Sequence, residues 1–143
     1  MKKFAVTLML FLCNGTLGQE KPRAIQVDEF GGIVCEDLHA RVDNFHIQLS
    51  NNPMFTGIVV ITPGKGSYNK AQFFRNYIER YSQRREVDLT RIKFYKTAEH
   101  DSVQGSLWLL PAGAELPIPD LQEWPAKPFD LSKPFIFGSE SDI

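Results

Sequence analysis

The chain has 143 residues, and its 16 basic side chains almost balance 17 acidic ones, so the formal net charge at pH 7 is −1. This balance argues against nucleic acid as a partner, because phosphate binding needs a clustered surplus of Lys and Arg. The length allows one modest hydrophobic core and leaves no room for a second full domain.

Residues 1–18 have the pattern of a secretory signal peptide. Lys2 and Lys3 give a positive start, and the uncharged run over residues 4–13 is too short to span a bilayer. We expect cleavage after Gly18, which leaves 14 basic against 17 acidic side chains, a net charge of −3. The mature chain is therefore expected to be periplasmic or secreted, without a transmembrane segment. Cys35 is then its only cysteine, so the fold must be held by packing rather than by an internal disulfide.

The first half of the mature chain reads as strand, helix and strand. After a polar leader, residues 30–35 read as a short first strand despite two glycines. A helix is expected over residues 36–50, where apolar residues recur at helical spacing and Asn52-Pro53 ends the pattern. Residues 57–61 form a β-branched run typical of a strand buried on both faces, so we expect this to be the central strand.

The second half repeats the alternation. A turn-rich link over residues 62–67 leads to a second amphipathic helix that begins at Tyr68. Strands are expected at residues 92–95 and 103–110. The order β-α-β-α-β-β predicts an α/β domain of the α+β two-layer type, a mixed sheet with two helices packed on it. The short link between the last two strands predicts that they form an antiparallel pair. The expected core is Leu38, Val42, Phe45, Leu49, Val59, Ile61, Phe74, Ile78 and Ile92.

Residues 114–143 form a tail that is rich in proline and has no helical period. Its aromatic side chains are Trp124, Phe129, Phe135 and Phe137. A proline-fixed extended segment loses little entropy when it docks. We expect part of the tail to lie across the domain and cover apolar surface, and the alternative is that it presents its aromatics to a partner protein.

The block CEDLHARVDNF at residues 35–45 resembles a group of uncharacterised exported bacterial proteins. Asn52-Pro53, the Asp-x-x-Arg-Ile step at residues 88–92 and LWLLPAG at residues 107–113 extend the likeness over roughly residues 28–113. That group is similar to a reduced OmpA-like periplasmic domain, whose β-α-β-α-β order this chain shares. The resemblance implies an OmpA-like domain at residues 19–113.

Full OmpA-like domains bind the diaminopimelate of peptidoglycan through an Asp in the loop after the middle strand and an Arg on the following helix. The corresponding loop here, residues 62–67, has no carboxylate, and the helix position aligned with the Arg carries Lys70. The family's residues therefore do not carry over. The resemblance supports the fold and the exported compartment, and leaves peptidoglycan as a candidate ligand without its usual pair.

A strand, a Gly-rich link and a helix can hold an anion, because backbone N–H groups and the positive end of the helix point to one place. The alternative is an ordinary connecting turn in which glycine supplies left-handed angles. The long spacing of a nucleotide-binding P-loop is missing. The candidate ligand-binding residues are Gly64, Lys65, Gly66, Ser67, Lys70 and Arg75.

His39, Asp43 and His46 share one face of the first predicted helix, with Cys35 one turn earlier. They are a weak candidate for a metal site, because a zinc site would also want ligands from a second element, and solvated polar residues are the simpler interpretation. We expect no metal and no other cofactor.

No Ser-His-Asp order, paired-carboxylate pattern or dinucleotide fingerprint appears, so we expect no catalytic residues and a non-enzymatic protein. The function predicted is binding at the cell envelope, to peptidoglycan, another anionic ligand or an envelope protein. The alternatives are a purely structural protein–protein interaction module and a small secreted enzyme. The sequence leaves the oligomeric state open.

Overall fold

The computed structural model describes residues 20–32 and 35–126, and the predicted signal peptide lies outside them. The elements in chain order are β1 (Ile25–Phe30), α1 (Cys35–Asn51), β2 (Thr56–Thr62), α2 (Tyr68–Arg84), the short 3-10 helix η1 (Leu89–Arg91), β3 (Ile92–Lys96), β4 (Gln104–Leu110) and β5 (Gln122–Glu123). None of the helices among these residues is long and apolar enough to cross a bilayer.

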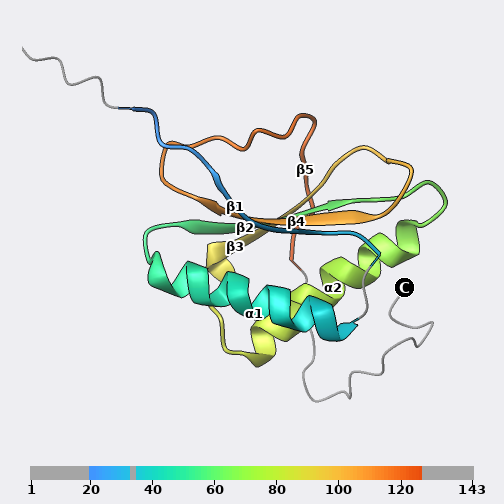
Figure 1. Cartoon of the computed structure of the whole chain (residues 1–143), viewed down its shortest axis with the longest axis horizontal. Helices are drawn as coiled ribbons and strands as arrows, with labels where there is room; N and C mark the ends of the chain where they lie inside the picture. Colours follow the sequence, from blue (N-terminus) through green and yellow to red (C-terminus); the bar gives the residue numbers. More distant parts are fainter. Residues whose placement is uncertain (1–19, 33–34, 127–143) are drawn as a thin grey trace, which may run out of the picture.

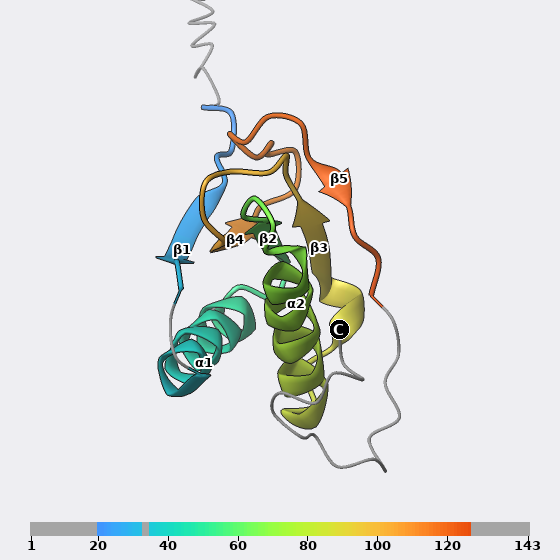
Figure 2. The same cartoon turned by 90° about the vertical axis from the view of Figure 1, so that its right-hand side faces the viewer.

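The strands form one mixed sheet in the order β1-β4-β2-β3-β5. β2 lies in the middle, parallel to β3 and antiparallel to β4, as expected of its β-branched run. Both helices lie on one face of the sheet (Figures 1 and 2). The predicted α+β two-layer fold with two helices on a mixed sheet is confirmed.

The main core fills the space between the helices and the sheet. All nine predicted core residues are buried in it. α1 packs closely on β2 at Gly57, where an added Cβ would come within 2.7 Å of the Phe45 ring. The absence of a side chain at this position lets the helix approach the strand.

The first strand was predicted at the wrong place. β1 ends at Phe30, whereas the prediction began there, and Cys35 is the first residue of α1 rather than the last of the strand. β1 is polar because it is an edge strand, paired only with β4, so most of its side chains reach solvent. Asp28 of this strand accepts a hydrogen bond from Arg41 of α1 at 2.6 Å, which ties the edge to the helix layer.

The prediction that the strands at residues 92–95 and 103–110 form an antiparallel pair is also wrong. These strands are β3 and β4, and they are not neighbours in the sheet. β4 lies on the other side of β2 and pairs antiparallel with both β2 and β1. Leu107 and Leu109 of β4 face the helix layer, whereas Trp108 packs on the opposite face. A strand with buried side chains on both faces is stable in the interior of the sheet. Residues 97–103 connect β3, on one side of β2, to β4 on the other side.

The opposite face of the sheet is covered by residues 114–126, which we call the strap. Leu116, Ile118 and Leu121 of the strap pack against a second cluster formed by Ile58, Val60 and Trp108. The strap then forms β5 and pairs with the edge of β3 (Figure 2). This part of the predicted tail thus lies on its own domain, while Phe129, Phe135 and Phe137 are outside the described residues.

Truncation of the chain after Gly113 removes the strap and should lower the thermal midpoint clearly, by roughly 10 °C or more, because three partly buried aliphatic side chains lose their contacts. Differential scanning calorimetry measures this shift. Truncation after Ala126 keeps the strap and is the reference. Equal midpoints for the two truncated chains would show that the strap contributes nothing to the fold.

Candidate functional site

The predicted anion-binding loop connects β2 to α2 and is held against the loop that follows β3. The N–H of Lys65 donates to the carbonyl of His100 at 2.9 Å, and the N–H of His100 donates to the carbonyl of Pro63 at 2.9 Å. Gly64 is buried in this contact, where an added Cβ would come within 2.8 Å of the Val103 nitrogen. Gly66 has φ +68, a left-handed angle that other residues rarely adopt. The loop conformation therefore depends on both glycines.

The amino end of α2 carries positive charge without an acidic side chain in its first turn. Its first N–H groups, at Tyr68 and Asn69, have no partner within the helix, and the Ser67 side chain does not cap them. Lys70 is exposed in the first turn. Lys65 is exposed in the preceding loop, where its Nζ pairs with Asp101 at 3.0 Å. Five of the six predicted ligand residues, 64–67 and 70, therefore lie together at this end of the molecule.

Arg75, the sixth, is not part of this exposed surface. Its side chain is only 2 % exposed, and its Nη1 pairs with a carboxylate oxygen of Glu79, which is 0 % exposed, at 2.8 Å. Burial lowers the pKa of Arg75, and the Glu79 carboxylate opposes this change. Arg75 is buried because it lies on the sheet-facing side of α2. Its charge is therefore paired inside the protein and does not face a ligand.

The Arg75 guanidinium joins α2 to the strap. It lies 5.4 Å from the centre of the Phe94 ring and 5.8 Å from that of Trp124, and its Nη2 donates to the carbonyl of Pro125. Trp124 in turn stacks on Tyr68, with 5.8 Å between the ring centres. The sequence drew attention to Trp124 as an aromatic of the tail, but its contacts with Arg75 and Tyr68 depend on residues about 50 positions away, which no local pattern reveals.

The residues of the weak metal candidate lie where α1 packs on α2. His39 packs against the rings of Tyr77 and Tyr81, with centre distances of 5.2 and 4.7 Å. Asp43 accepts hydrogen bonds from the Tyr81 hydroxyl at 2.9 Å and from Arg85 at 2.8 and 3.0 Å. His46 is 7 % exposed and stacks on Tyr81, so it is not the solvated residue that its place beside the apolar stripe suggested.

The surroundings of His46 favour one tautomer of its neutral form. Nε2–H of His46 donates to the Ser82 oxygen at 2.8 Å and the Ser82 hydroxyl donates to the carbonyl of Ile78 at 2.8 Å, whereas the other tautomer would bury Nδ1–H without an acceptor. Nδ1 then carries the lone pair, and it is buried without a hydrogen-bond partner. Burial lowers the pKa of His46; the Asp43 carboxylate opposes this, and Arg85 lowers the pKa further.

This geometry fits neither a catalytic serine nor a three-residue metal site. His46 donates to Ser82 and therefore cannot take its proton, and Ser82 is fully buried. Within residues 20–32 and 35–126, no three His, Cys, Asp or Glu side chains are grouped so that they could hold a metal ion. The side-chain position of Cys35 lies outside the description.

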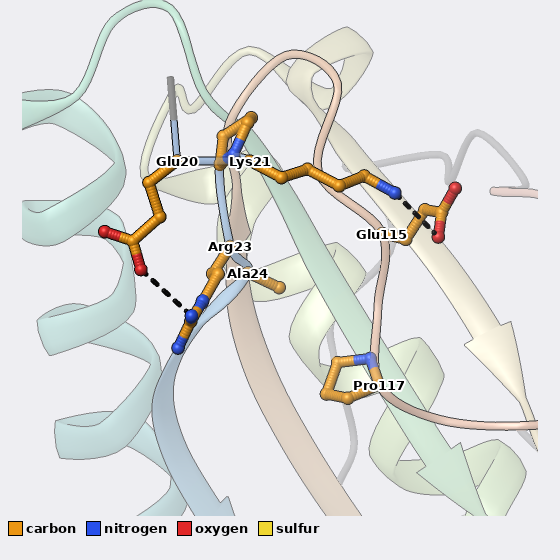
Figure 3. A pocket seen from close by; sticks show the side chains of 7 residues that line it. Glu20, Lys21, Arg23, Ala24, Glu115 and Pro117 are labelled. Carbon is orange, nitrogen blue, oxygen red and sulfur yellow. Dashed lines mark hydrogen bonds and ion pairs between the residues drawn. The ribbon is translucent and has the colours of Figure 1, made fainter. Parts of the chain in front are cut away.

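A surface hollow of about 360 Å³ lies at the opposite end of the sheet (Figure 3). Two exposed ion pairs border it, Lys21 with Glu115 at 3.4 Å and Arg23 with Glu20 at 2.9 Å. Exposed pairs of this kind contribute little to stability or binding. The Lys21 pair does link the start of the described chain to the strap.

Comparisons with family models, with curated proteins and with solved structures found no match to this chain.

Replacing Arg75 with Met should lower the free energy of unfolding by about 3–5 kcal/mol, because it removes the buried guanidinium that pairs with the buried Glu79 carboxylate. Urea unfolding followed by circular dichroism measures the loss. The double variant Arg75→Met/Glu79→Leu removes both charges and should regain most of the stability. A single variant that unfolds within about 1 kcal/mol of the wild type would contradict this role of the pair.

Proposed function

We propose that this chain is an exported binding domain of the cell envelope, related to OmpA-like periplasmic domains, which holds an anionic ligand at the amino end of α2. Peptidoglycan, a polymer of sugars with carboxylate-bearing peptides, is the ligand that we propose. The domain would bind it through Lys65, Lys70 and the backbone of residues 64–67. The proposed compartment rests on the signal pattern of residues 1–18.

The observation that carries the proposal is the open, positive end of α2. The helix dipole and the free N–H groups of the first turn favour a negative ligand there, and no acidic side chain of that turn competes. Two exposed lysines flank this end. The Lys65–Asp101 pair is exposed, so a ligand with several carboxylates can replace Asp101 at little cost.

A second feature suits a polymer that also contains sugar rings. Tyr68, at the start of α2, is 42 % exposed although its side chain is large and apolar. Trp124 supports it from the strap side, and the Lys96 ammonium lies 5.8 Å from the centre of the Tyr68 ring. An aromatic ring that packs on Trp124 and lies beside the Lys96 ammonium offers an apolar surface and a positive charge to the same ligand.

Pull-down of residues 19–143 on purified peptidoglycan tests the proposal. The double variant Lys65→Ala/Lys70→Ala should be retained about tenfold less well than the wild type, because it loses both cations of the site. Lys21→Ala is the matched control, since Lys21 is 69 % exposed and ion-paired like Lys65, which is 71 % exposed, but lies at the opposite end of the sheet.

Equal retention of the wild type and the double variant would remove this site. A lower retention of Lys21→Ala alone would move the ligand to the hollow of Figure 3. If peptidoglycan retained none of the proteins, the proposed ligand would be wrong and an interaction module for another protein would be favoured.

A further inference from the structure

The contact between α1 and the carboxyl end of α2 contains a buried histidine that faces charged groups from both helices. We call Asp43, His46, Tyr81, Ser82 and Arg85 the helix joint. Asp43 lies on the same helix as His46, Tyr81 and Ser82 come from α2, and Arg85 directly follows α2. Of the titratable and charged groups in the joint, only Asp43 and Arg85 carry a charge at neutral pH, and they are bonded to each other.

A proton can reach His46 only at Nδ1, because Nε2 already holds one and donates it to Ser82. Nδ1–H would be a buried donor, and burying a charged donor without an acceptor is costly. The Asp43 carboxylate attracts the protonated ring. Its oxygens already accept three hydrogen bonds from Arg85 and Tyr81 in the neutral joint, so a protonated His46 would compete with Arg85 for the one carboxylate between them.

We propose that the helix joint is a pH-sensitive switch, in which protonation of His46 draws Asp43 away from Arg85 and releases the turn at residues 85–87 from α1. A cleft of about 570 Å³, lined by Asp43, His46, Ile47, Ser50, Asn51, Arg85 and Val87, opens beside the joint. It gives protons access to the imidazole and gives Arg85 room to move into solvent. The acid form exposes more of the partly buried Val87 side chain along the widened cleft.

The direction of the response follows from the buried neutral ring. Burial holds the pKa of His46 below its ordinary value of 6.5 in the closed joint, whereas the ring is free to take a proton once the joint has opened. Opening is therefore coupled to the uptake of one proton. As the pH falls below 6.5, the open fraction should rise, by up to about fivefold over the first pH unit, until the closed form itself takes the proton.

Hydrogen exchange of three backbone amides reports whether the turn at residues 85–87 is closed on α1 or released from it. The N–H groups of Arg85, Glu86 and Val87 are bonded to the carbonyls of Tyr81, Gln83 and Ser82. Between pH 6.5 and 5.5, their protection factors, corrected for the intrinsic exchange rate, should fall by up to about fivefold in the wild type. The amide of Trp124, bonded to the Phe94 carbonyl, belongs to another part of the fold and should keep its protection.

Two variants separate the switch from general acid lability. His46→Gln keeps a donor for Ser82 but cannot take a proton, so the turn should stay protected at both pH values. Asp43→Asn weakens the hold on Arg85, so the turn should be poorly protected at both. The proposal is overturned if His46→Gln loses protection as the wild type does, if the wild type keeps its protection at pH 5.5, or if the Trp124 amide loses protection in parallel.

Discussion

The buried guanidinium of Arg75 is the contact on which the completed fold depends. A charged group in an interior must be paired to be tolerated, and the two terminal nitrogens of Arg75 find partners in Glu79, Asn76 and the Pro125 carbonyl. Pro125 belongs to the strap, so the hydrogen bond of Nη2 forms only when the strap is in place. Trp124 covers the same guanidinium and pairs through its N–H with the Phe94 carbonyl of β3. One side chain thus makes the helix layer, the sheet edge and the strap depend on one another.

The sheet distributes its side chains so that each face needs a separate cover. The register of β2 with β4 sets Val59 opposite Leu107 under the helices and Ile58 opposite Trp108 on the other face. Two helices suffice for the first face. The second has only a small apolar cluster, and an extended strap with three aliphatic side chains matches it without adding another layer of helix.

The parts of this fold that sequence predicts are those whose signal is local. The stripe of α1 and the run of β2 repeat apolar residues at the spacing of their own element, and both elements were placed correctly. β1 was not predicted at residues 25–30 because an edge strand that contains Asp28 and Glu29 resembles a polar leader. The pairing of β4 depends on competition among strands, which no single segment records.

The candidate sites also divide into those with a local sequence signal and those that depend on distant residues. Lys65 and Lys70 lie together because the loop and the first turn that carry them are adjacent in the chain. Arg75 and His46 were misplaced because their partners are distant, Pro125 in the strap and Ser82 on the second helix. The residue types of Arg75 and His46 indicate only that one carries a charge and the other can bind a proton. The packing of α2 on the sheet and of α1 on α2 shows that both side chains face inward.

The pairing of β1 with β4 also constrains the order in which the molecule can assemble. Among the described residues β1 pairs only with β4, so the first of the described strands finds its place only after β2 and β4 are available. Contacts between such distant segments are slow to form, because the intervening chain must close a large loop. A chain that emerges from its amino end therefore exposes an incomplete sheet until nearly all of its residues have been delivered. The domain therefore folds late during synthesis, and the fold is complete only when the strap has been added.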